Sequence, residues 1–152
     1  MALQIGMPAP AFTGELQDGS TVTLQDYAGR TLLLYFYPKD NSPGCTTQAC
    51  NLRDGYAELR AKGVEVLGVS PDSSKVHTGF IAKHSLPFPL LTDGDHTVAQ
   101  AYGVWVQKQR CGRTYMGVAR QSFLIDGQGI IVHIFDAVKT GAHAQQVLDV
   151  LG

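Results

Sequence analysis

Two cysteines close to a predicted helix start are the residues of this chain best suited to do chemistry. An apolar run over residues 32–37 breaks at Pro38, and a helical pattern begins at Cys45. Ser42 and Pro43 mark the boundary, because Ser is a favoured N-cap and Pro a favoured first helical residue. A helix N-terminus offers unpaired N–H groups and a partial positive charge, which together stabilise an anion. The pattern therefore predicts a nucleophilic Cys45 thiolate between a strand and a helix.

The spacing between Cys45 and Cys50 limits how these two thiols can pair. At about 100° per residue, Cys50 points about 140° away from Cys45 around the helix axis. Cys45 instead shares one apolar stripe with Ala49, Leu52, Tyr56 and Leu59. Five residues also rise about 7.5 Å along the axis, beyond the separation of about 7 Å that a disulfide tolerates. A bond between the two cysteines would therefore require the first turns to unwind, as a step in a reaction cycle. The alternative is that both are simply buried small hydrophobic residues.

Length and composition indicate an ordinary globular chain. Its 152 residues are expected to form one domain over 1–152 that buries about 70% of the unfolded surface. A net charge of −1, with 44% hydrophobic and 16% charged residues, predicts neither nucleic acid nor a membrane surface as a partner. No signal peptide or membrane-spanning run is recognised, so a cytoplasmic protein is expected. Three cysteines fit reactive thiols in a reducing compartment better than a disulfide framework.

The order of predicted elements indicates an α/β fold. Residues 11–24 alternate around a turn at Asp18-Gly19, which predicts a small hairpin. The strand over 32–37, a helix from Cys45 to about Lys62 and a strand over 64–69 form a βαβ unit with parallel strands. The later elements are a helix starting in 71–75, an edge strand or approach at 86–91, a short helix at 95–102, strands at 121–125 and 130–135, and an amphipathic helix after residue 141.

These elements predict a thioredoxin-like fold, with an N-terminal β-hairpin and a mixed central sheet covered by helices on both faces. Residues 104–119 have a strand-like start and a polar middle, and their structure is the least defined by pattern. In open α/β sheets the reactive site lies beyond the carboxyl ends of the strands. Pro38 and Cys45 follow such an end.

The same residues carry a resemblance to a known family. Pro38, Ser42 and Cys45 match P-x-x-x-[TS]-x-x-C, the active-site signature of peroxiredoxins, and FYPKDNSPGCTTQAC resembles the bacterioferritin comigratory protein, or peroxiredoxin Q, branch. Similar segments cover nearly the whole chain: GMPAPAF, VLGVSPD, LLTD, RQSFLID and FDAVKTGAH. The resemblance implies a thiol peroxidase acting on hydrogen peroxide and organic hydroperoxides. Cys45 would attack the peroxide, Cys50 would resolve the sulfenic acid as an intramolecular disulfide, and thioredoxin or a glutaredoxin-like dithiol would reduce it.

Three further residues are candidates for the site. The Ser42 hydroxyl stands where Thr is more usual, and it can accept from and donate to a peroxide unless it is engaged in capping the helix. Pro38 has a rigid ring and no N–H, which suits it to shaping the pocket and excluding water. Arg120 lies in an R-x-[ST]-F segment that resembles the place where peroxiredoxins keep their thiolate-stabilising arginine. The simpler interpretation of Arg120 is a solvated strand end.

The remaining cysteine and the histidines are weaker candidates. Cys111 lies in the basic segment QKQRCGR, where it is either an unused surface thiol, a backup resolving thiol or the site of an intermolecular disulfide. The histidines show no metal-ligand spacing, and no nucleotide-binding loop is present, so neither metal nor cofactor is expected. Those histidines are His77, His84, His96, His133 and His143. We expect a monomer or a weak homodimer.

Two other functions use the same residues. A thiol-disulfide exchange protein would share the fold, but that chemistry uses C-x-x-C, whereas four residues separate Cys45 from Cys50. A redox-sensing interaction protein would be oxidised stoichiometrically and then bind a partner. Turnover with peroxide distinguishes both alternatives from a peroxidase.

Overall fold

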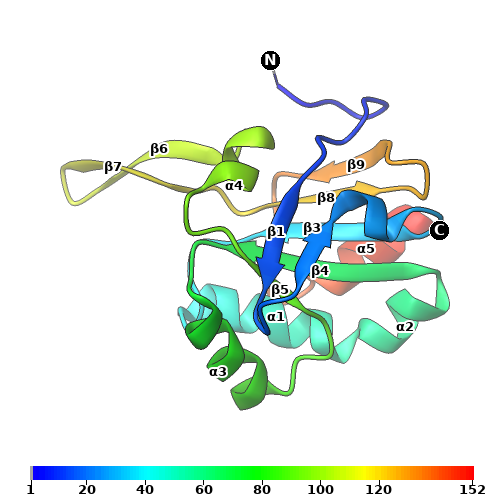
Figure 1. Ribbon diagram of the computed structural model, residues 1–152, viewed down its shortest axis with the longest axis horizontal. Helices are drawn as coiled ribbons and strands as arrows, with labels where there is room; N and C mark the ends of the chain where they lie inside the picture. Colours follow the sequence, from blue (N-terminus) through cyan, green and yellow to red (C-terminus); the bar gives the residue numbers. More distant parts are fainter. Residues whose placement is uncertain (1) are drawn as a thin grey trace.

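A seven-stranded mixed sheet forms the centre of the computed structural model, which describes residues 2–152 (Figure 1). The strand order is β2-β1-β5-β4-β3-β8-β9, in which β3, β4 and β5 are parallel and β8 is antiparallel to β3. The strands of this sheet are β1 Thr13–Leu16, β2 Thr21–Thr23, β3 Thr31–Phe36, β4 Val64–Ser70, β5 Leu90–Thr92, β8 Gln121–Ile125 and β9 Ile131–Phe135. The helices are η1 Leu24–Tyr27, α1 Pro43–Asp54, α2 Tyr56–Ala61, α3 Ser74–His84, α4 Thr97–Ala101 and α5 His143–Leu151.

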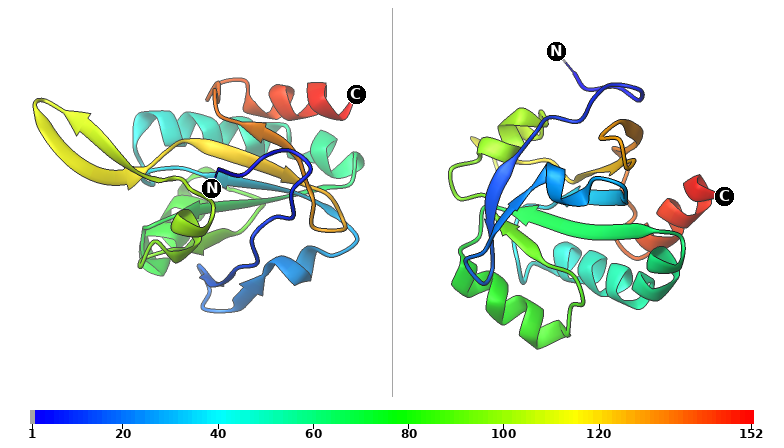
Figure 2. Two further views of the ribbon diagram at one scale, coloured as in Figure 1. Left: turned by 90° about the horizontal axis from the view of Figure 1, so that it is seen from above. Right: turned by 45° about the vertical axis from the view of Figure 1, so that its right-hand side comes forward.

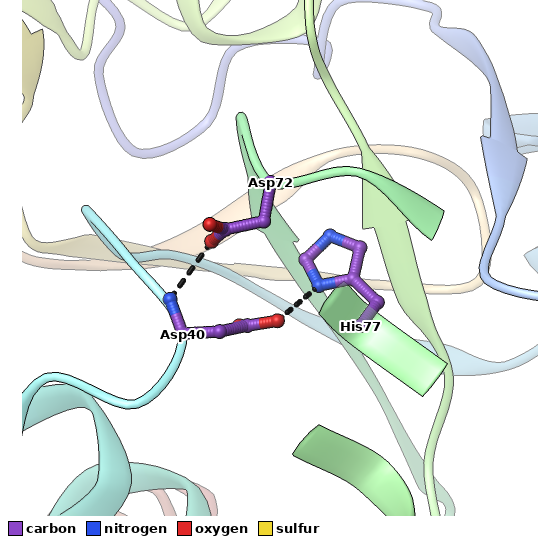
Figure 3. Close-up of side chains that lie close together, drawn as sticks. All are labelled: Asp40, Asp72 and His77. Carbon is purple, nitrogen blue, oxygen red and sulfur yellow. Dashed lines mark hydrogen bonds and ion pairs between the residues drawn. The ribbon is translucent and has the colours of Figure 1, made fainter. Parts of the chain in front are cut away.

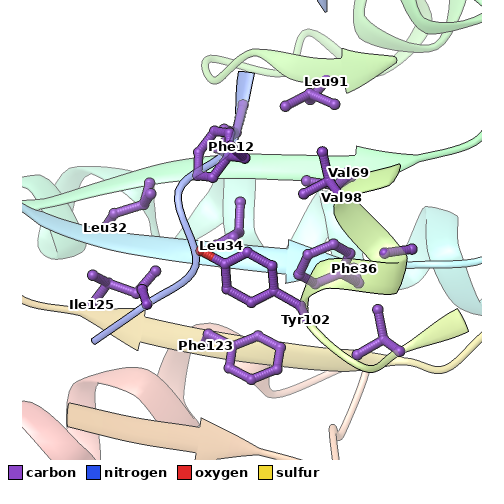
Figure 4. Packing of buried hydrophobic residues seen from close by; sticks show 14 of the residues in the cluster. Phe12, Leu32, Leu34, Phe36, Val69, Leu91, Val98, Tyr102, Phe123 and Ile125 are labelled. Carbon is purple, nitrogen blue, oxygen red and sulfur yellow. The ribbon is translucent and has the colours of Figure 1, made fainter. Parts of the chain in front are cut away.

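Strand β3 is buried on both faces, as its continuous apolar sequence predicts. Leu32, Leu34 and Phe36 belong to one buried cluster, which also holds Tyr102 and Phe123 (Figure 4). The alternate residues Leu33, Tyr35 and Tyr37 belong to a second cluster on the other face. Because successive side chains of a strand point to opposite faces, a strand with two buried faces lies in the middle of the sheet.

The helices cover both faces of the sheet. Residues of α1, α2, α3 and α5 pack in the cluster that contains Leu33, whereas α4, η1 and the segment before β1 contribute to the cluster that contains Leu32. Figures 1 and 2 show this division into layers. The predicted mixed sheet with helices on both faces and an N-terminal hairpin is confirmed. Within residues 2–152, no helix is long and apolar enough to cross a bilayer.

Residues 86–91 were predicted to form an edge strand or an approach to the sheet; residues 86–89 are such an approach, and the edge alternative is wrong. The two prolines of this segment precede β5, which lies inside the sheet between β4 and β1. Glu15 and Leu16 of β1 pair with Thr92 and Leu91, so the N-terminal hairpin covers the free side of β5. This pairing joins segments that are about 75 residues apart, which local pattern does not reveal.

The helix predicted to run unbroken from Cys45 to Lys62 is divided at Gly55 into α1 and α2. A Cβ atom built on Gly55 would lie 2.5 Å from the Cβ of Ala144 in α5. Gly55 therefore allows the α1–α2 junction to pack closely against α5. The predicted end is confirmed, because Gly63 follows α2 with a φ of 79°.

Residues 104–119, whose pattern was least defined, contain a second hairpin. Strands β6 (Trp105–Arg110) and β7 (Arg113–Val118) form a separate two-stranded sheet, which projects from the body of the protein (Figures 1 and 2). Cys111 and Gly112 make the turn with φ angles of 52° and 77°. Positive φ at both central residues suits a tight two-residue hairpin turn.

Two glycine substitutions test the close packing at the α1–α2 junction. We expect Gly55→Ala to lower the free energy of unfolding by about 1–3 kcal/mol, because the added methyl group would overlap Ala144. Gly79→Ala is the matched control: a Cβ at this exposed position of α3 meets no heavy atom within 4 Å. It should raise the free energy of unfolding by roughly 0.5–1 kcal/mol. Urea titration followed by circular dichroism measures both, and equal effects would contradict the close approach of α5.

Candidate active site

The loop from β3 into α1 places Cys45 in the first turn of the helix. Asn41 has a φ of 66°, a left-handed conformation that Asn tolerates better than most residues. Ser42 then occupies the N-cap position with extended backbone angles, and Pro43 is the first helical residue. The predicted order of strand, loop, thiol and helix is confirmed.

Ser42 does not use its side chain to cap α1. Its hydroxyl donates instead to the Lys39 carbonyl oxygen at 2.9 Å. The expected competition between capping and substrate is therefore absent, and the hydroxyl oxygen keeps its capacity to accept. Within residues 2–152, the backbone N–H groups of Gly44 and Cys45 have no intrahelical acceptor and no side-chain cap. These groups are free to donate to a bound oxygen atom.

Arg120 reaches Cys45 through the pairing of two strands. Phe36 at the end of β3 pairs with Gln121 at the start of β8, so Arg120 lies beside the carboxyl end of β3. Its NH2 group donates to Cys45 Sγ at 3.3 Å. The same group would lie 3.1 Å from a Cβ on Gly44, so a glycine there leaves room for the guanidinium. The structure thus brings together two of the residues singled out in the sequence.

The groups around the Cys45 sulfur provide positive charge. Cys45 is 1% exposed, so water contributes little to stabilising its charge. Arg120, which is always protonated, and the N-terminus of α1 provide positive charge in place of water. A second cation lies in the same region, since desolvation and the charge of Arg120 lower the pKa of Lys108. The Lys108 ammonium donates to the Val118 carbonyl oxygen at 2.5 Å, at the base of the β6–β7 hairpin.

Gln48 is a residue of the site that sequence reasoning missed. It is fully buried in α1, and its Oε1 accepts from Arg120 NH1 at 2.6 Å. Its Nε2 has no hydrogen-bond partner among residues 2–152. Gln48 holds one arm of the guanidinium while the other arm contacts Cys45. The available signal was a polar residue three positions after Cys45, on the same side of the helix as the apolar stripe.

A second missed feature is a buried network behind the loop (Figure 3). Asp40 Oδ2 lies 2.6 Å from His77 Nδ1, and neither side chain is exposed. Burial raises the pKa of Tyr37 well above its ordinary value, so its hydroxyl remains protonated and donates to Asp40 Oδ1 at 2.5 Å. Asp72 Oδ2 accepts from the Asp40 backbone N–H at 2.8 Å. These bonds tie the loop before Cys45 to α3 and to the end of β4.

The acceptors in this network show where its protons lie. His77 Nε2 lies 3.2 Å from the Leu91 carbonyl oxygen, which can only accept, so Nε2 carries a proton. One further proton lies between Nδ1 and Asp40 Oδ2, and the pair is neutral overall whichever atom holds it. Asp40, Asp72 and His77 each offer an atom within 4.8 Å of the others, as a metal site would. The Asp40 and His77 atoms bond each other, and Asp72 Oδ2 accepts from the Asp40 backbone N–H and the Ser70 hydroxyl, so a metal ion would have to break these hydrogen bonds.

The other predicted site residues are Cys50, Cys111 and Pro38. Cys50 is half-buried on the intact α1 helix, and its Sγ lies 3.6 Å from His84 Nδ1. Cys45, Cys50 and Cys111 are all free thiols. Cys111 is exposed at the tip of the β6–β7 hairpin. Pro38 is half-buried at the end of β3. The structure therefore brings Arg120 to Cys45 and leaves Cys50 on another side of the helix.

Comparisons with known proteins agree over almost the whole chain. Residues 5–134 match the AhpC/TSA family. A protein of Haemophilus influenzae named putative peroxiredoxin bcp is 50% identical over 149 residues, which cover 98% of this chain and 96% of the relative. A peroxiredoxin Q structure from Xanthomonas campestris has a TM-score of 0.87 at 38% identity, covering 92% of this chain and 89% of that one. A cysteine-to-serine mutant of peroxiredoxin Q from Xylella fastidiosa has a TM-score of 0.91 at 34% identity, covering 98% and 95%.

Substitution of Asp40 tests whether the buried network supports the fold. We expect Asp40→Asn to lower the free energy of unfolding by about 1–3 kcal/mol, because it removes the proton shared with His77 and leaves buried polar atoms imperfectly paired. Asp54→Asn is the control, since this carboxylate pairs with Arg53 at the surface and should matter little. Urea titration measures both variants. Equal stability of Asp40→Asn and the unsubstituted protein would exclude a supporting role for the pair.

Proposed function

The chain belongs to the AhpC/TSA family, in its bacterioferritin comigratory protein (peroxiredoxin Q) branch, and is a thiol peroxidase; we propose that Cys45 is its peroxide-reacting thiol. The single observation that carries this proposal is the 3.3 Å contact between Arg120 NH2 and Cys45 Sγ at the N-terminus of α1. A buried thiolate beside a permanent cation is the nucleophile that this reaction requires.

The proposed first step is attack of the Cys45 thiolate on one peroxide oxygen. The sulfur electron pair forms the S–O bond as the O–O bond breaks, and the attacked oxygen keeps its hydrogen or gains one, giving a sulfenic acid. The other oxygen leaves with negative charge and takes a proton to become water or an alcohol. Arg120 and the free N–H groups of Gly44 and Cys45 are the donors that stabilise this developing negative charge. We assign the Ser42 hydroxyl to holding the peroxide and Pro38 to shaping the pocket.

The proposed second step joins Cys50 to the oxidised Cys45. The intact α1 keeps these residues apart, so its first turns must unwind before the sulfurs meet. Asn51 marks where we expect the unwinding to end. Its Nδ2 donates to the Gly141 carbonyl oxygen and its Oδ1 accepts from the Ala144 N–H, each at 2.9 Å. These bonds fasten the later part of α1 to the start of α5 while residues 43–50 rearrange.

The remaining parts of the cycle are proposed from chemistry. Peroxiredoxins act on peroxides with a thiol reductant, and we propose thioredoxin or a glutaredoxin-like protein as that reductant here. Alkyl peroxide reduction activity is attributed to the Xanthomonas campestris bacterioferritin comigratory protein, which supports organic hydroperoxides as substrates beside hydrogen peroxide. We further propose a single domain, a monomer or weak homodimer, and a cytoplasmic location where the three thiols stay reduced.

Removing the guanidinium tests the proposed role of Arg120. We expect Arg120→Met to slow the reaction of Cys45 with peroxide by roughly a hundredfold or more, as for other lost charge-stabilising donors. Stopped-flow kinetics with peroxide measures this rate. Arg113→Met, near the hairpin tip, is the matched control; equal behaviour of the two variants would contradict the assignment.

Removing single cysteines tests the assignment of the two sulfurs. We expect Cys45→Ser to abolish peroxidase activity, and Cys50→Ser to react once with peroxide and then stop, because no thiol completes the disulfide. Cys111→Ser is the matched control and should turn over normally. NADPH consumption with peroxide, thioredoxin and thioredoxin reductase is the measurement. Normal turnover of Cys50→Ser would exclude Cys50 as the resolving thiol and direct attention to Cys111.

A further inference from the structure

We propose that His84 is a catalytic residue of the resolving step, in which its Nδ1 takes the proton of the Cys50 thiol. The inference rests on the proposed function, because it requires Cys50 to be the resolving thiol. It assigns a base to the second half of the cycle, whereas the Arg120 contact serves the first.

The geometry of the contact suits a proton transfer. Cys50 Sγ lies 3.6 Å from His84 Nδ1, within hydrogen-bond range for sulfur. Both side chains are half-buried, so the pair is partly shielded from water. Helix α3 ends at His84. The His84 ring packs edge-to-face with the Phe80 ring, with 5.1 Å between ring centres. The base is therefore held against the thiol by its own helix.

Arg53 connects the two helices at the same point. Its NH1 donates to the His84 carbonyl oxygen at 2.8 Å, which docks the end of α3 onto α1 three residues after Cys50. Its Nε also pairs with Asp54 at 3.0 Å. The hydrogen bond to Asp54 and the nearby Cys50 raise the pKa of Arg53, and partial desolvation lowers it by less. Arg53 therefore places a permanent positive charge near Cys50.

The charges around the imidazole allow it to hold the transferred proton. Cys50 contacts the ring itself, and three charged residues lie near His84. Arg53 binds the His84 carbonyl oxygen, Asp54 pairs with Arg53, and Lys83 precedes His84 in the last turn of α3. The C-terminus of α3 carries partial negative charge, which stabilises an imidazolium in the last turn. The positive charges of Lys83 and Arg53 disfavour an imidazolium, although Asp54 partly neutralises the charge of Arg53. Imidazole also titrates within the physiological range, so it can both take and release a proton.

The step balances without any reagent beyond the peroxide already consumed. The S–H bond of Cys50 breaks as an N–H bond forms on His84, which leaves a thiolate and an imidazolium. The thiolate electron pair then forms the S–S bond to Cys45 while the S–O bond of the sulfenic acid breaks. The departing hydroxide becomes water, and the imidazolium returns its proton to the solvent. The contact exists only while α1 is folded, so proton transfer precedes unwinding.

The test compares two proteins that both carry Cys111→Ser, one with native His84 and one with His84→Asn. Asn keeps a polar group near the position of Nδ1 but does not titrate at working pH. Reduced protein is mixed rapidly with hydrogen peroxide and quenched with a thiol-alkylating agent, and mass spectrometry follows the Cys45–Cys50 disulfide in time. The earlier, peroxide-dependent phase reports whether Cys45 and its surroundings are intact. Lys83→Gln is the matched control, because it removes a neighbouring charge from the same helix end.

We expect His84→Asn to slow disulfide formation by roughly a hundredfold at neutral pH, the usual effect of losing a general base. Its rate should recover only as the pH approaches about 8.5, where an ordinary thiol ionises without help. Lys83→Gln should change the rate by less than about twofold and leave the shape of the pH profile, because this exposed charge is screened by water. His84→Gln repeats the experiment if the Asn variant fails to fold.

The other outcomes separate the two proposals. If the disulfide forms in the His84 variants with unchanged rate and pH profile, the role of His84 is overturned while Cys50 remains the resolving thiol. If slowing is equal at all pH values, His84 only holds α3 against α1, and the general-base role is overturned. If the protein with native His84 forms no Cys45–Cys50 disulfide, the proposed function of Cys50 fails, and the role of His84 fails with it.

Discussion

The contact between the Arg120 guanidinium and Cys45 Sγ is the interaction on which the rest of the site depends. A sulfur that is 1% exposed has little water to stabilise a negative charge, so the protein must supply positive charge from fixed groups. The helix N-terminus provides part of it through local structure alone. The guanidinium comes from the residue just before β8, 75 residues away in the chain, and Gln48 holds its second arm. Together they surround the buried sulfur with positive charge in a mostly apolar interior.

The surrounding structure has two opposed requirements. Attack on peroxide needs a folded α1 and a loop held in one conformation, which the buried Asp40–His77 pair and the Tyr37 hydroxyl support. Disulfide formation needs the first turns of that helix to open. The two hydrogen bonds of Asn51 to the start of α5 separate these requirements along one helix. In the proposed cycle, residues 43–50 rearrange while the part of α1 from Asn51 onward stays fastened to α5.

Much of the fold could be predicted because its signals are local. The apolar run of β3, the Ser-Pro start of α1 and the hairpins around Asp18-Gly19 and residues 126–129 each depend on neighbours in the chain. The break at Gly55 could not be predicted, because it depends on close packing against Ala144 in a helix far along the chain. The interior position of β5 was also missed, because prolines near a strand suggest an edge unless the hairpin that covers it is known.

The sequence by itself determined the chemistry of the candidate nucleophile: a thiol in the first turn of a helix, its hydroxyl neighbour, and a second thiol that cannot reach it without unwinding. These follow from residue types and from helix geometry, which act over a few positions. Only the tertiary structure decided which distant groups meet those thiols. The register of β3 with β8 brings Arg120 to Cys45, and the docking of α3 on α1 brings His84 to Cys50. Such contacts are set by strand pairing and helix packing across the whole core, which no local pattern encodes.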